Sequence, residues 1–322
     1  MGIVTLLKPS DIQIITDVKK EEAVIQACID KYGYMPEHHY HYLCCSEDNI
    51  AYGVMVQYND YGWLGLEYSD MWEMIAEPMA PEEDRIPMLL KFLEFALLQE
   101  KAKKVFVEFT GPFRRKVLRA LREDGRFHAR KPCDVLHWPL FYMNKWDHTL
   151  SGGQWKKLRN IKNKFMKEHK VEFVSPDQCA KDELKAIVTA WGERRKGSDK
   201  ANTELYLNMV EAGFPGFDMV RVAVIDGKPC AITGGWKVPN KNMYYSSLGV
   251  LNYNVDRLGD ITNLDDLMTL KKRKYKMVDF GGGGKNMLEF KKKFKYHTSY
   301  KTFIFAIVTK EAQEQKNGHR IL

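Results

Sequence analysis

An aspartate and four glycines near the C-terminus combine residue types that can support group-transfer chemistry. Asp279 ends a strand-like run, and Gly281, Gly282, Gly283 and Gly284 follow it. Successive glycines leave backbone N–H groups unhindered, so these groups can converge on a phosphate or an oxyanion. The run can equally be a sharp turn between a strand and a helix. A carboxylate beside such a loop is a candidate general base or amine-orienting group, or else a cap of the turn.

Other kinds of site find little support in the sequence. The glycine run is not a P-loop, because Lys285 and Asn286 follow it where that motif needs Lys and then Ser or Thr. We include Lys285 among the residues that would contact an anion held by the loop. No G-x-S-x-G stretch marks a serine nucleophile. The six cysteines show no C-x-x-C spacing, so we expect reduced thiols and no metal site.

The composition indicates a globular protein with an uneven charge distribution. The chain has 322 residues, which favours two domains, with 44% hydrophobic and 29% charged residues. No apolar run is long enough for a membrane span and no secretory signal is recognisable, so we expect a cytoplasmic protein. Residues 1–100 carry 6 Lys and Arg against 18 Asp and Glu, whereas the other 222 carry 44 against 24. This basic part predicts an anionic partner such as tRNA, DNA or a phosphorylated donor.

Two basic stripes at helical spacing are candidates for gripping a nucleic-acid backbone. Each stripe can also be an ordinary solvated helix face. The candidate nucleic-acid-binding residues are Arg114, Arg115, Lys156, Lys157, Arg159 and Lys162.

Hydrophobic periodicity predicts a mixed α/β chain made of two similar halves. In the first half we expect helices over 21–33, 86–102 and 111–124, and strands over 38–45, 50–59, 61–78, 103–110 and 135–143. In the second half we expect helices over 151–169, 181–196, 203–212 and 261–275. Its strands should cover 170–175, the hairpin 218–238 with a turn at Asp226-Gly227, 241–251, 276–281 and 300–309.

A boundary in the Asn-, Asp-, Ser- and Gly-rich stretch 144–153 would separate the two halves. We therefore expect a first domain over 1–147, a second over 148–310 that carries the active site, and a polar tail over 311–322. The repeated order of elements favours a duplication, although no repeat is visible residue by residue.

The order of strands and helices resembles the GNAT N-acyltransferase superfamily, and two copies in tandem resemble its Fem-type branch. That branch comprises aminoacyl and acyl transferases and is related to lysyl-phosphatidylglycerol synthase C-terminal domains. The stretches "WKKLRNIKNKF", "VIDGKPCAITGGW" and "DFGGGGKNMLEFKKKF" carry the likeness. The resemblance implies two GNAT-like domains and transfer from an activated donor without a covalent enzyme intermediate.

The resemblance also directs attention to a coenzyme A cradle, which in GNAT proteins reads R/Q-x-x-G-x-G/A at a helix N-terminus. Here the matching place reads "DRLGDI", so Asp256 takes the R/Q position, and Asp260 follows the lone Gly259. Two carboxylates would repel a pyrophosphate, although Gly259 remains a candidate donor contact. An aminoacyl-tRNA donor is therefore favoured over acyl-CoA, and no cofactor is certain.

Four residues become candidate catalytic groups on this resemblance. Besides Asp279, Lys291 takes the lysine of an F-K-x-x-F pattern and would neutralise a donor phosphate or the oxyanion. Tyr244 and Tyr245 lie on the strand that lines the acyl group in GNAT enzymes, and alternation turns only one of them, taken as Tyr245, toward the cleft. Asp260 would contact the acceptor amine or cap a helix.

The sequence thus predicts an acyltransferase or aminoacyltransferase acting on an amine acceptor. One alternative is a GNAT-like enzyme that modifies a nucleic-acid base or side group, as in phage DNA modification. Another is a nucleic-acid-binding module without catalysis.

Overall fold

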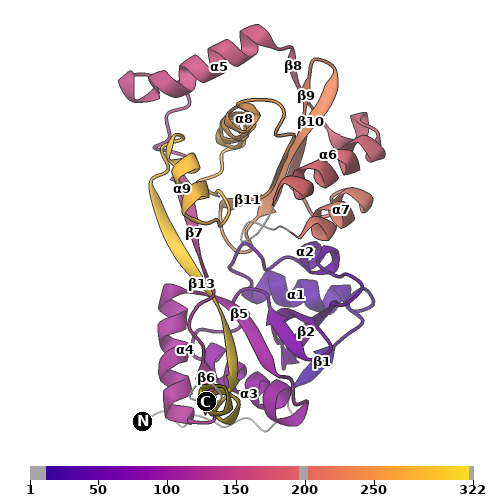
Figure 1. Cartoon of the computed structure of the whole chain (residues 1–322), viewed down its shortest axis with the longest axis vertical. Helices are drawn as coiled ribbons and strands as arrows, with labels where there is room; N and C mark the ends of the chain where they lie inside the picture. The colour runs from indigo at the N-terminus through magenta and orange to yellow at the C-terminus, as the bar shows by residue number, and fades with distance from the viewer. Residues whose placement is uncertain (1–11, 196–201, 319–322) are drawn as a thin grey trace. The chain divides into compact units, whose positions relative to one another are not determined.

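The computed structural model describes residues 12–195 and 202–318, and the chain divides into two compact units (Figure 1). The first unit consists of Met1–His137 and Tyr300–Leu322, and the second of Trp138–Ser299. Both are built from a mixed sheet with helices against it, which confirms the predicted α/β class. No helix within the described ranges is both long and apolar enough to cross a bilayer.

The first unit forms its sheet in the order β1-β2-β3-β4-β5-β13, with β6 paired to β13. The pairing of β4 with β5 is parallel, and the others in this order are antiparallel. Its strands are β1 (Gln13–Ile15), β2 (Tyr52–Tyr58), β3 (Tyr61–Glu67), β4 (Met71–Met74), β5 (Lys104–Thr110), β6 (Phe127–Ala129) and β13 (Thr298–Thr309). Its helices are α1 (Glu22–Tyr32), α2 (Tyr40–Cys45), α3 (Arg85–Leu93) with its π-helical continuation η2 (Glu94–Gln99), α4 (Gly111–Asp124) and α10 (Lys310–Gly318).

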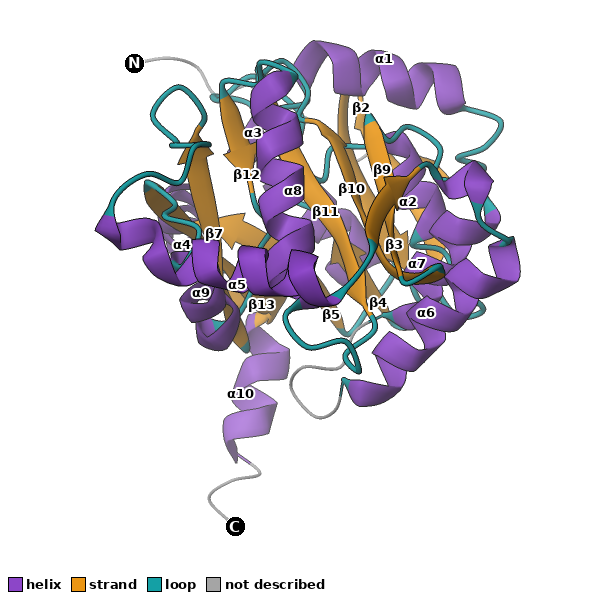
Figure 2. Ribbon diagram, turned by 90° about the horizontal axis from the view of Figure 1, so that it is seen from above, coloured by secondary structure: helices purple, strands orange, loops and turns teal. Residues whose placement is uncertain are grey.

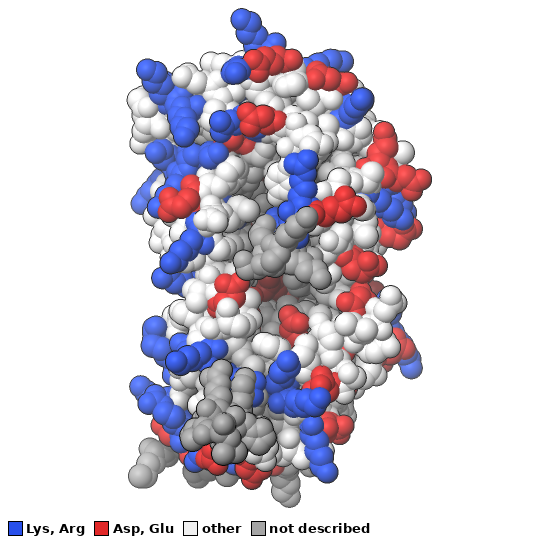
Figure 3. Space-filling view, viewed as in Figure 1, with Lys and Arg blue, Asp and Glu red and all other residues white. Residues whose placement is uncertain are grey.

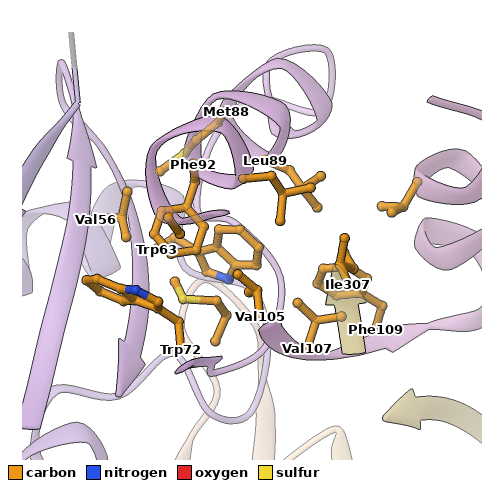
Figure 4. Close-up of a cluster of buried hydrophobic side chains, with 14 of the residues drawn as sticks. Val56, Trp63, Trp72, Met88, Leu89, Phe92, Val105, Val107, Phe109 and Ile307 are labelled. Carbon is orange, nitrogen blue, oxygen red and sulfur yellow. The ribbon is translucent and has the colours of Figure 1, made fainter. Parts of the chain in front are cut away.

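Aromatic side chains dominate the core of the first unit (Figure 4). Trp63 of β3 stacks on Phe109 of β5 and meets the edge of Phe92 from α3. Trp72 contacts Phe92 from a second side. Burying such rings removes a large apolar area from water, so this packing fixes α3 on the sheet.

The second unit has the strand order β7-β12-β11-β10-β9-β8. The pairing of β11 with β12 is parallel, and its neighbours in this order are antiparallel. Its strands are β7 (Asp134–Tyr142), β8 (Val171–Val174), β9 (Met219–Ile225), β10 (Lys228–Lys237), β11 (Met243–Leu251) and β12 (Met277–Asp279). Its helices are η3 (Gly153–Trp155), α5 (Lys156–Glu168), η4 (Pro176–Gln178), α6 (Lys181–Arg194), α7 (Thr203–Glu211), α8 (Leu258–Lys272) and α9 (Lys285–Lys292).

Helices flank the sheet of the second unit on both sides. Figure 1 shows α8 on one side of β10 and β11, and α6 with α7 on the other, while Figure 2 shows α8 lying along these strands. Tyr244 of β11 and Val278 of β12 pack with Leu264 and Leu267 of α8 in one core. Because side chains alternate along a strand, Tyr245 and Asp279 point to the opposite face.

The last predicted strand of each half pairs in the unit formed mainly by the other half. β13, at the end of the second half, pairs with β5 of the first unit. β7, at the end of the first half, pairs with β12 of the second. The units therefore change at 137/138 and again at 299/300 rather than once at 147/148. Apolar alternation identifies a strand but not the edge that it joins, which is why the sequence did not reveal this exchange.

Most predicted elements are present, but one is wrong. Residues 38–45 were expected as a strand, yet Tyr40–Cys45 forms the helix α2. The Nδ1 atom of His39 accepts a hydrogen bond from the Tyr42 amide at 3.1 Å and so caps this helix. The tail beyond residue 310 begins as the helix α10, and residues 319–322 of the tail, like Lys196 at the end of one predicted helix, lie outside the described residues.

A glycine on β10 controls the position of Tyr245. A Cβ atom on Gly235 would lie 1.8 Å from the carbonyl oxygen of Tyr245, at a point where the β10–β11 register shifts. Gly235→Ala should therefore lower the free energy of unfolding by about 3 kcal/mol, because the strands must move apart. Urea unfolding measures this change.

Gly249→Ala is the matched control, since a Cβ atom on Gly249 of β11 would meet no atom within 4 Å. Its free energy of unfolding should stay within about 1 kcal/mol of the wild type. Equal effects of the two substitutions would contradict the steric explanation.

Candidate functional site

Asp279 lies at the point where two parallel strands part. The β11–β12 ladder has three residue pairs and ends where Tyr245 faces Asp279. β11 then continues to Leu251 alongside β10, whereas the chain after β12 turns away at Gly281, which has a φ of +77°. Asp279 is fully buried, and its Oδ1 accepts a hydrogen bond from the Gly281 amide at 3.1 Å. The structure thus holds a carboxylate at the start of the split between the strands.

Aromatic side chains lie on the same face of the sheet as this carboxylate. Tyr245 pairs across β11 and β10 with Trp236, and their ring centroids are 5.2 Å apart. Trp138 of β7 lies 5.9 Å from Tyr245 on the other side. Leu140 of β7 pairs directly with Asp279. Around a carboxylate, such rings reduce access of water and strengthen its electrostatic interactions.

The glycine loop is shaped by close contacts. A Cβ atom on Gly281 would lie 3.0 Å from the Ser246 carbonyl oxygen, and one on Gly282 would lie 2.6 Å from the Trp138 ring. One on Gly283 would meet the side chain of Met287 at 2.9 Å, whereas one on Gly284 would meet nothing within 4 Å. Packing therefore explains three of the glycines. Lys285, the first residue of α9, is exposed.

Lys291 of α9 holds the glycine loop through hydrogen bonds to its backbone. Its Nζ donates hydrogen bonds to the carbonyl oxygens of Phe280 and, at 2.9 Å, of Gly281. Burial lowers the pKa of Lys291 to about 8, and the nearby Asp279 carboxylate opposes this shift. The amine therefore lies within the predicted site, with its proton donors directed at the loop backbone.

Asp260 forms an ion pair. It lies buried in the first turn of α8, where its carboxylate binds the Nζ of Lys293, the residue directly after α9. The Lys293 ammonium also lies 4.1 Å from the Phe290 ring centroid. A Cβ atom on Gly259 would lie 3.4 Å from that same ring. Phe290 of α9 and Lys293, which follows the helix, therefore cover the first turn of α8.

The backbone amides of this turn are also used internally. The Leu258 amide donates to the Val255 carbonyl, and the amides of Asp260 and Ile261 donate to that of Arg257. A helix N-terminus binds a pyrophosphate through amides that point to the ligand. Three amides at this helix N-terminus, those of Leu258, Asp260 and Ile261, are therefore already engaged.

The predicted nucleic-acid-binding residues have different surroundings. Lys156 and Lys157 are exposed on α5, and Lys162 is half-buried. Arg159 instead binds the carbonyl oxygens of Leu150 and, at 2.7 Å, of Gly152. In the first unit, Arg114 stacks over the rings of Phe303 and Phe305, whereas Arg115 is exposed on α4.

The structure thus brings together Asp279, Lys291, Tyr245 and the glycine loop, and it adds two aromatic residues that sequence reasoning missed. Trp138 and Trp236 lie in stretches correctly predicted as strands, but strand periodicity does not distinguish them from other apolar strand residues. Their contacts distinguish them: both rings flank Tyr245, and the Trp138 ring occupies space that a side chain at Gly282 would fill.

Comparison with known proteins identifies the family of this chain. Residues 34–281 match the model of the family described as phosphatidylglycerol lysyltransferase, C-terminal. The chain belongs to this family. It is accordingly a transferase of the acyl or aminoacyl class, as the sequence predicted. A search of curated protein sequences found no match.

Solved structures confirm the tandem GNAT-like fold. A conserved protein of unknown function from Bacteroides thetaiotaomicron has a TM-score of 0.67 at 14% identity, covering 92% of this chain and 98% of its own. L-PGS from Bacillus licheniformis has a TM-score of 0.62 at 16% identity, covering 88% and 90%. A tandem GNAT protein from the clavulanic acid biosynthesis pathway has a TM-score of 0.54 at 10% identity, covering 92% and 98%. At these identities the likeness establishes the fold alone.

The shifted pKa of Lys291 makes folding stability depend on pH. An unfolded lysine keeps its proton up to about pH 10.5, whereas folded Lys291 releases it near 8. Between these values the unfolded state binds more protons, so the free energy of unfolding should rise with pH, by roughly 3 kcal/mol in total. Lys291→Met should lose this rise, as measured by urea unfolding from pH 7 to 10.

The exposed neighbour Lys292 provides the control. Lys292→Met should keep a pH profile parallel to that of the wild type. Parallel profiles for Lys291→Met and the wild type would show that Lys291 is not buried as an amine with a lowered pKa.

The ion pair between Asp260 and Lys293 should stabilise the contact of α8 with α9. Asp260→Asn should lower the free energy of unfolding by about 3 kcal/mol, because it leaves a largely buried ammonium without its counter-ion. The double variant Asp260→Leu with Lys293→Met should recover most of this loss, since apolar side chains can replace a buried pair. Asp260→Leu and Lys293→Met should also be measured singly. If the double variant loses as much stability as these two single variants lose together, the pair does not act as a unit.

Proposed function

We propose that this protein transfers an aminoacyl group from the ester of an aminoacyl-tRNA to the polar head group of a lipid. The proposal combines the family description, which names a phosphatidylglycerol lysyltransferase, with the geometry around Asp279. The single observation that carries it is a fully buried carboxylate at the split between β11 and β12.

The first turn of α8 decides between donors. An acyl-CoA donor needs free amides and a positive field for its pyrophosphate, whereas here the amides of Leu258, Asp260 and Ile261 are bonded within the turn and the Asp260 carboxylate lies among them. An aminoacyl-tRNA presents its activated ester at the end of a chain of phosphates and does not need this cradle. The donor class is therefore a tRNA ester in this proposal.

Asp279 acts as the general base. The acceptor hydroxyl attacks the ester carbonyl carbon while its proton passes to the Asp279 carboxylate, and a carbon–oxygen bond forms. The tetrahedral intermediate then collapses, the bond to the ribose oxygen of the tRNA breaks, and the proton passes from Asp279 to that oxygen. An amine acceptor, which the sequence predicts, would follow the same path.

Lys291 and the aromatic residues position this carboxylate in the proposal. Lys291 fixes the carbonyl groups of Phe280 and Gly281, and the Gly281 amide in turn holds Asp279. The rings of Trp138 and Tyr245, 5.9 Å apart, lie on the same face of the sheet as Asp279 and can hold the aminoacyl group by stacking or by cation–π contact with its ammonium. These residues therefore orient the reacting groups without a proton transfer of their own.

The direct test incubates the purified protein with tRNAs charged with radiolabelled amino acids and with phosphatidylglycerol vesicles. Label should appear in the lipid extract with at least one aminoacyl-tRNA, and acetyl-CoA should give no labelled product. Label appearing on an added amine in place of the lipid would identify the acceptor class that the sequence favoured. Transfer from acetyl-CoA alone would overturn the proposed donor.

Asp279→Asn should lower kcat/KM of this transfer by about 10²- to 10⁴-fold, because the amide cannot accept the acceptor proton. Asp256→Asn, the same substitution at an exposed carboxylate near α8, is the control and should retain activity. Thermal unfolding of both variants separates loss of chemistry from loss of folding. Full activity of Asp279→Asn would remove the general base from the mechanism.

A further inference from the structure

The first unit buries a carboxylate just beyond the parallel ladder of β4 and β5. Glu77 lies in the segment 75–84, which joins β4 to α3, and 3% of its surface is exposed. The Thr110 amide and hydroxyl donate to its Oε1 atom at 3.0 and 2.6 Å. The Tyr34 hydroxyl donates to its Oε2 atom at 2.8 Å. Both oxygens of this buried carboxylate are therefore bound by the protein.

The donors come from two places that are far apart in the sequence. Thr110 is the last residue of β5 and the N-cap of α4, so the positive end of that helix dipole lies beside the carboxylate. Tyr34 lies between α1 and α2, and the Arg85 guanidinium stacks 3.9 Å from its ring centroid. Burial raises the pKa of the Tyr34 hydroxyl, and the Glu77 carboxylate adds to this shift. The hydroxyl therefore keeps its proton and remains a donor at neutral pH.

The backbone around Glu77 is strained and is fixed by neighbouring side chains. Ala76 has a φ of +59°, a left-handed conformation that residues with a Cβ atom rarely adopt. The Trp63 indole donates to the Ala76 carbonyl oxygen at 3.1 Å. The Nδ1 atom of His38 accepts from a backbone amide, so its Nε2 donates to the Glu77 carbonyl oxygen at 2.8 Å. Strain of this kind persists where the surroundings fix it, and here it places the Glu77 side chain against its donors.

We infer that the end of β5, the start of α4 and Tyr34 form a carboxylate-binding site, and that the side chain of Glu77 is its internal ligand. An amide at a helix N-terminus and hydroxyl donors that converge on one group are typical of anion sites. The ligand class is a small monocarboxylate, because one oxygen binds at Thr110 and the other at Tyr34, and three neutral donors suit a single negative charge. In the wild type, Glu77 fills the site and excludes an external ligand.

The substitution Glu77→Ala tests this site, because it removes one methylene and one carboxylate, which together match acetate. Acetate at about 0.1 M should raise the Tm of this variant by about 3 to 5 °C relative to the same concentration of chloride, if its Kd is about tenfold lower than this concentration. Differential scanning fluorimetry measures the shift. Propionate should act more weakly on Glu77→Ala, since its additional methylene does not fit. In Glu77→Gly, which removes one carbon more, propionate should act at least as strongly as acetate.

The surface of the first unit makes an anion control necessary. In Figure 3, lysine and arginine side chains gather at the lower left, where Figure 1 shows α4. The exposed basic residues of this helix are Arg115, Lys116, Arg119 and Arg122. Such groups attract any anion, and salt screens the attraction. A shift that acetate produces and chloride does not is therefore the signature of the buried site.

Three controls assign the shift to this site. Glu82→Ala removes an exposed carboxylate from the same segment, one that pairs with Lys116, and should respond to acetate no more than the wild type does. Acetamide, which has the shape of acetate without its charge, should not stabilise Glu77→Ala. Adding Tyr34→Phe to Glu77→Ala should abolish most of the acetate shift, because one of the donors is lost.

The inference is overturned if acetate and chloride give Glu77→Ala the same Tm, if acetamide acts as strongly as acetate, or if Glu82→Ala shows the same shift. If Glu77→Ala does not fold in chloride, the fraction refolded on dilution from urea into acetate replaces Tm as the readout. Recovery in acetate would then support the site, and no recovery would overturn it.

This site and the proposed function can fail separately, because the measurement does not involve aminoacyl transfer. An acetate-specific shift in a protein that transfers no aminoacyl group would leave the carboxylate site standing and overturn the function. Transfer without an acetate-specific shift would do the reverse.

Discussion

The short parallel ladder between β11 and β12 is the constraint on which the site depends. Its three residue pairs place Tyr245 beside Asp279, and the strands part immediately afterwards. So short a ladder contributes few hydrogen bonds of its own. Its geometry is maintained from both sides, by β7 pairing antiparallel to β12 and by the close approach of Gly235 to the Tyr245 backbone. A change in either neighbour would move the carboxylate and the tyrosine relative to each other.

Two lysines at the end of α9, Lys291 within the helix and Lys293 directly after it, hold the elements around this ladder through different interactions. Lys293 gains a carboxylate partner, so its burial is offset by a direct ion pair with Asp260. Lys291 donates to uncharged carbonyl groups, and its lowered pKa shows that burial outweighs the attraction of Asp279. The fold therefore loses stability at Lys291 in exchange for a fixed loop beside a buried carboxylate. Strongly shifted groups of this kind concentrate at functional sites.

Much of this arrangement could be predicted from the sequence, because it depends on local patterns. Asp279, the glycine loop and Lys291 lie within thirteen residues of one another, and strand periodicity placed Asp279 at a strand end. The partners of Asp260 and the exchange of β7 and β13 could not be predicted. Both depend on which distant surfaces meet, and neither residue type nor spacing encodes that choice. The helix at 40–45 was missed because its cap, His39, also fits an alternating strand pattern.

The first unit provides a comparison that helps to locate the chemistry within the chain. Its own parallel ladder, between β4 and β5, ends where Met74 faces Val107, and β5 continues to Thr110. Beyond that point the buried Glu77 accepts hydrogen bonds from the amide and hydroxyl of Thr110 at 3.0 and 2.6 Å, and from the Tyr34 hydroxyl at 2.8 Å.

A side chain of the first unit thus takes up the polar groups at the end of β5 that an incoming ligand would otherwise contact. The helix α4 also begins directly after β5, without a glycine loop. In the second unit, the corresponding ladder ends beside a carboxylate, two tryptophans and a loop shaped by glycine. Two units of the same plan have therefore filled the gap between their parallel strands differently, which favours the second unit as the place of the reaction.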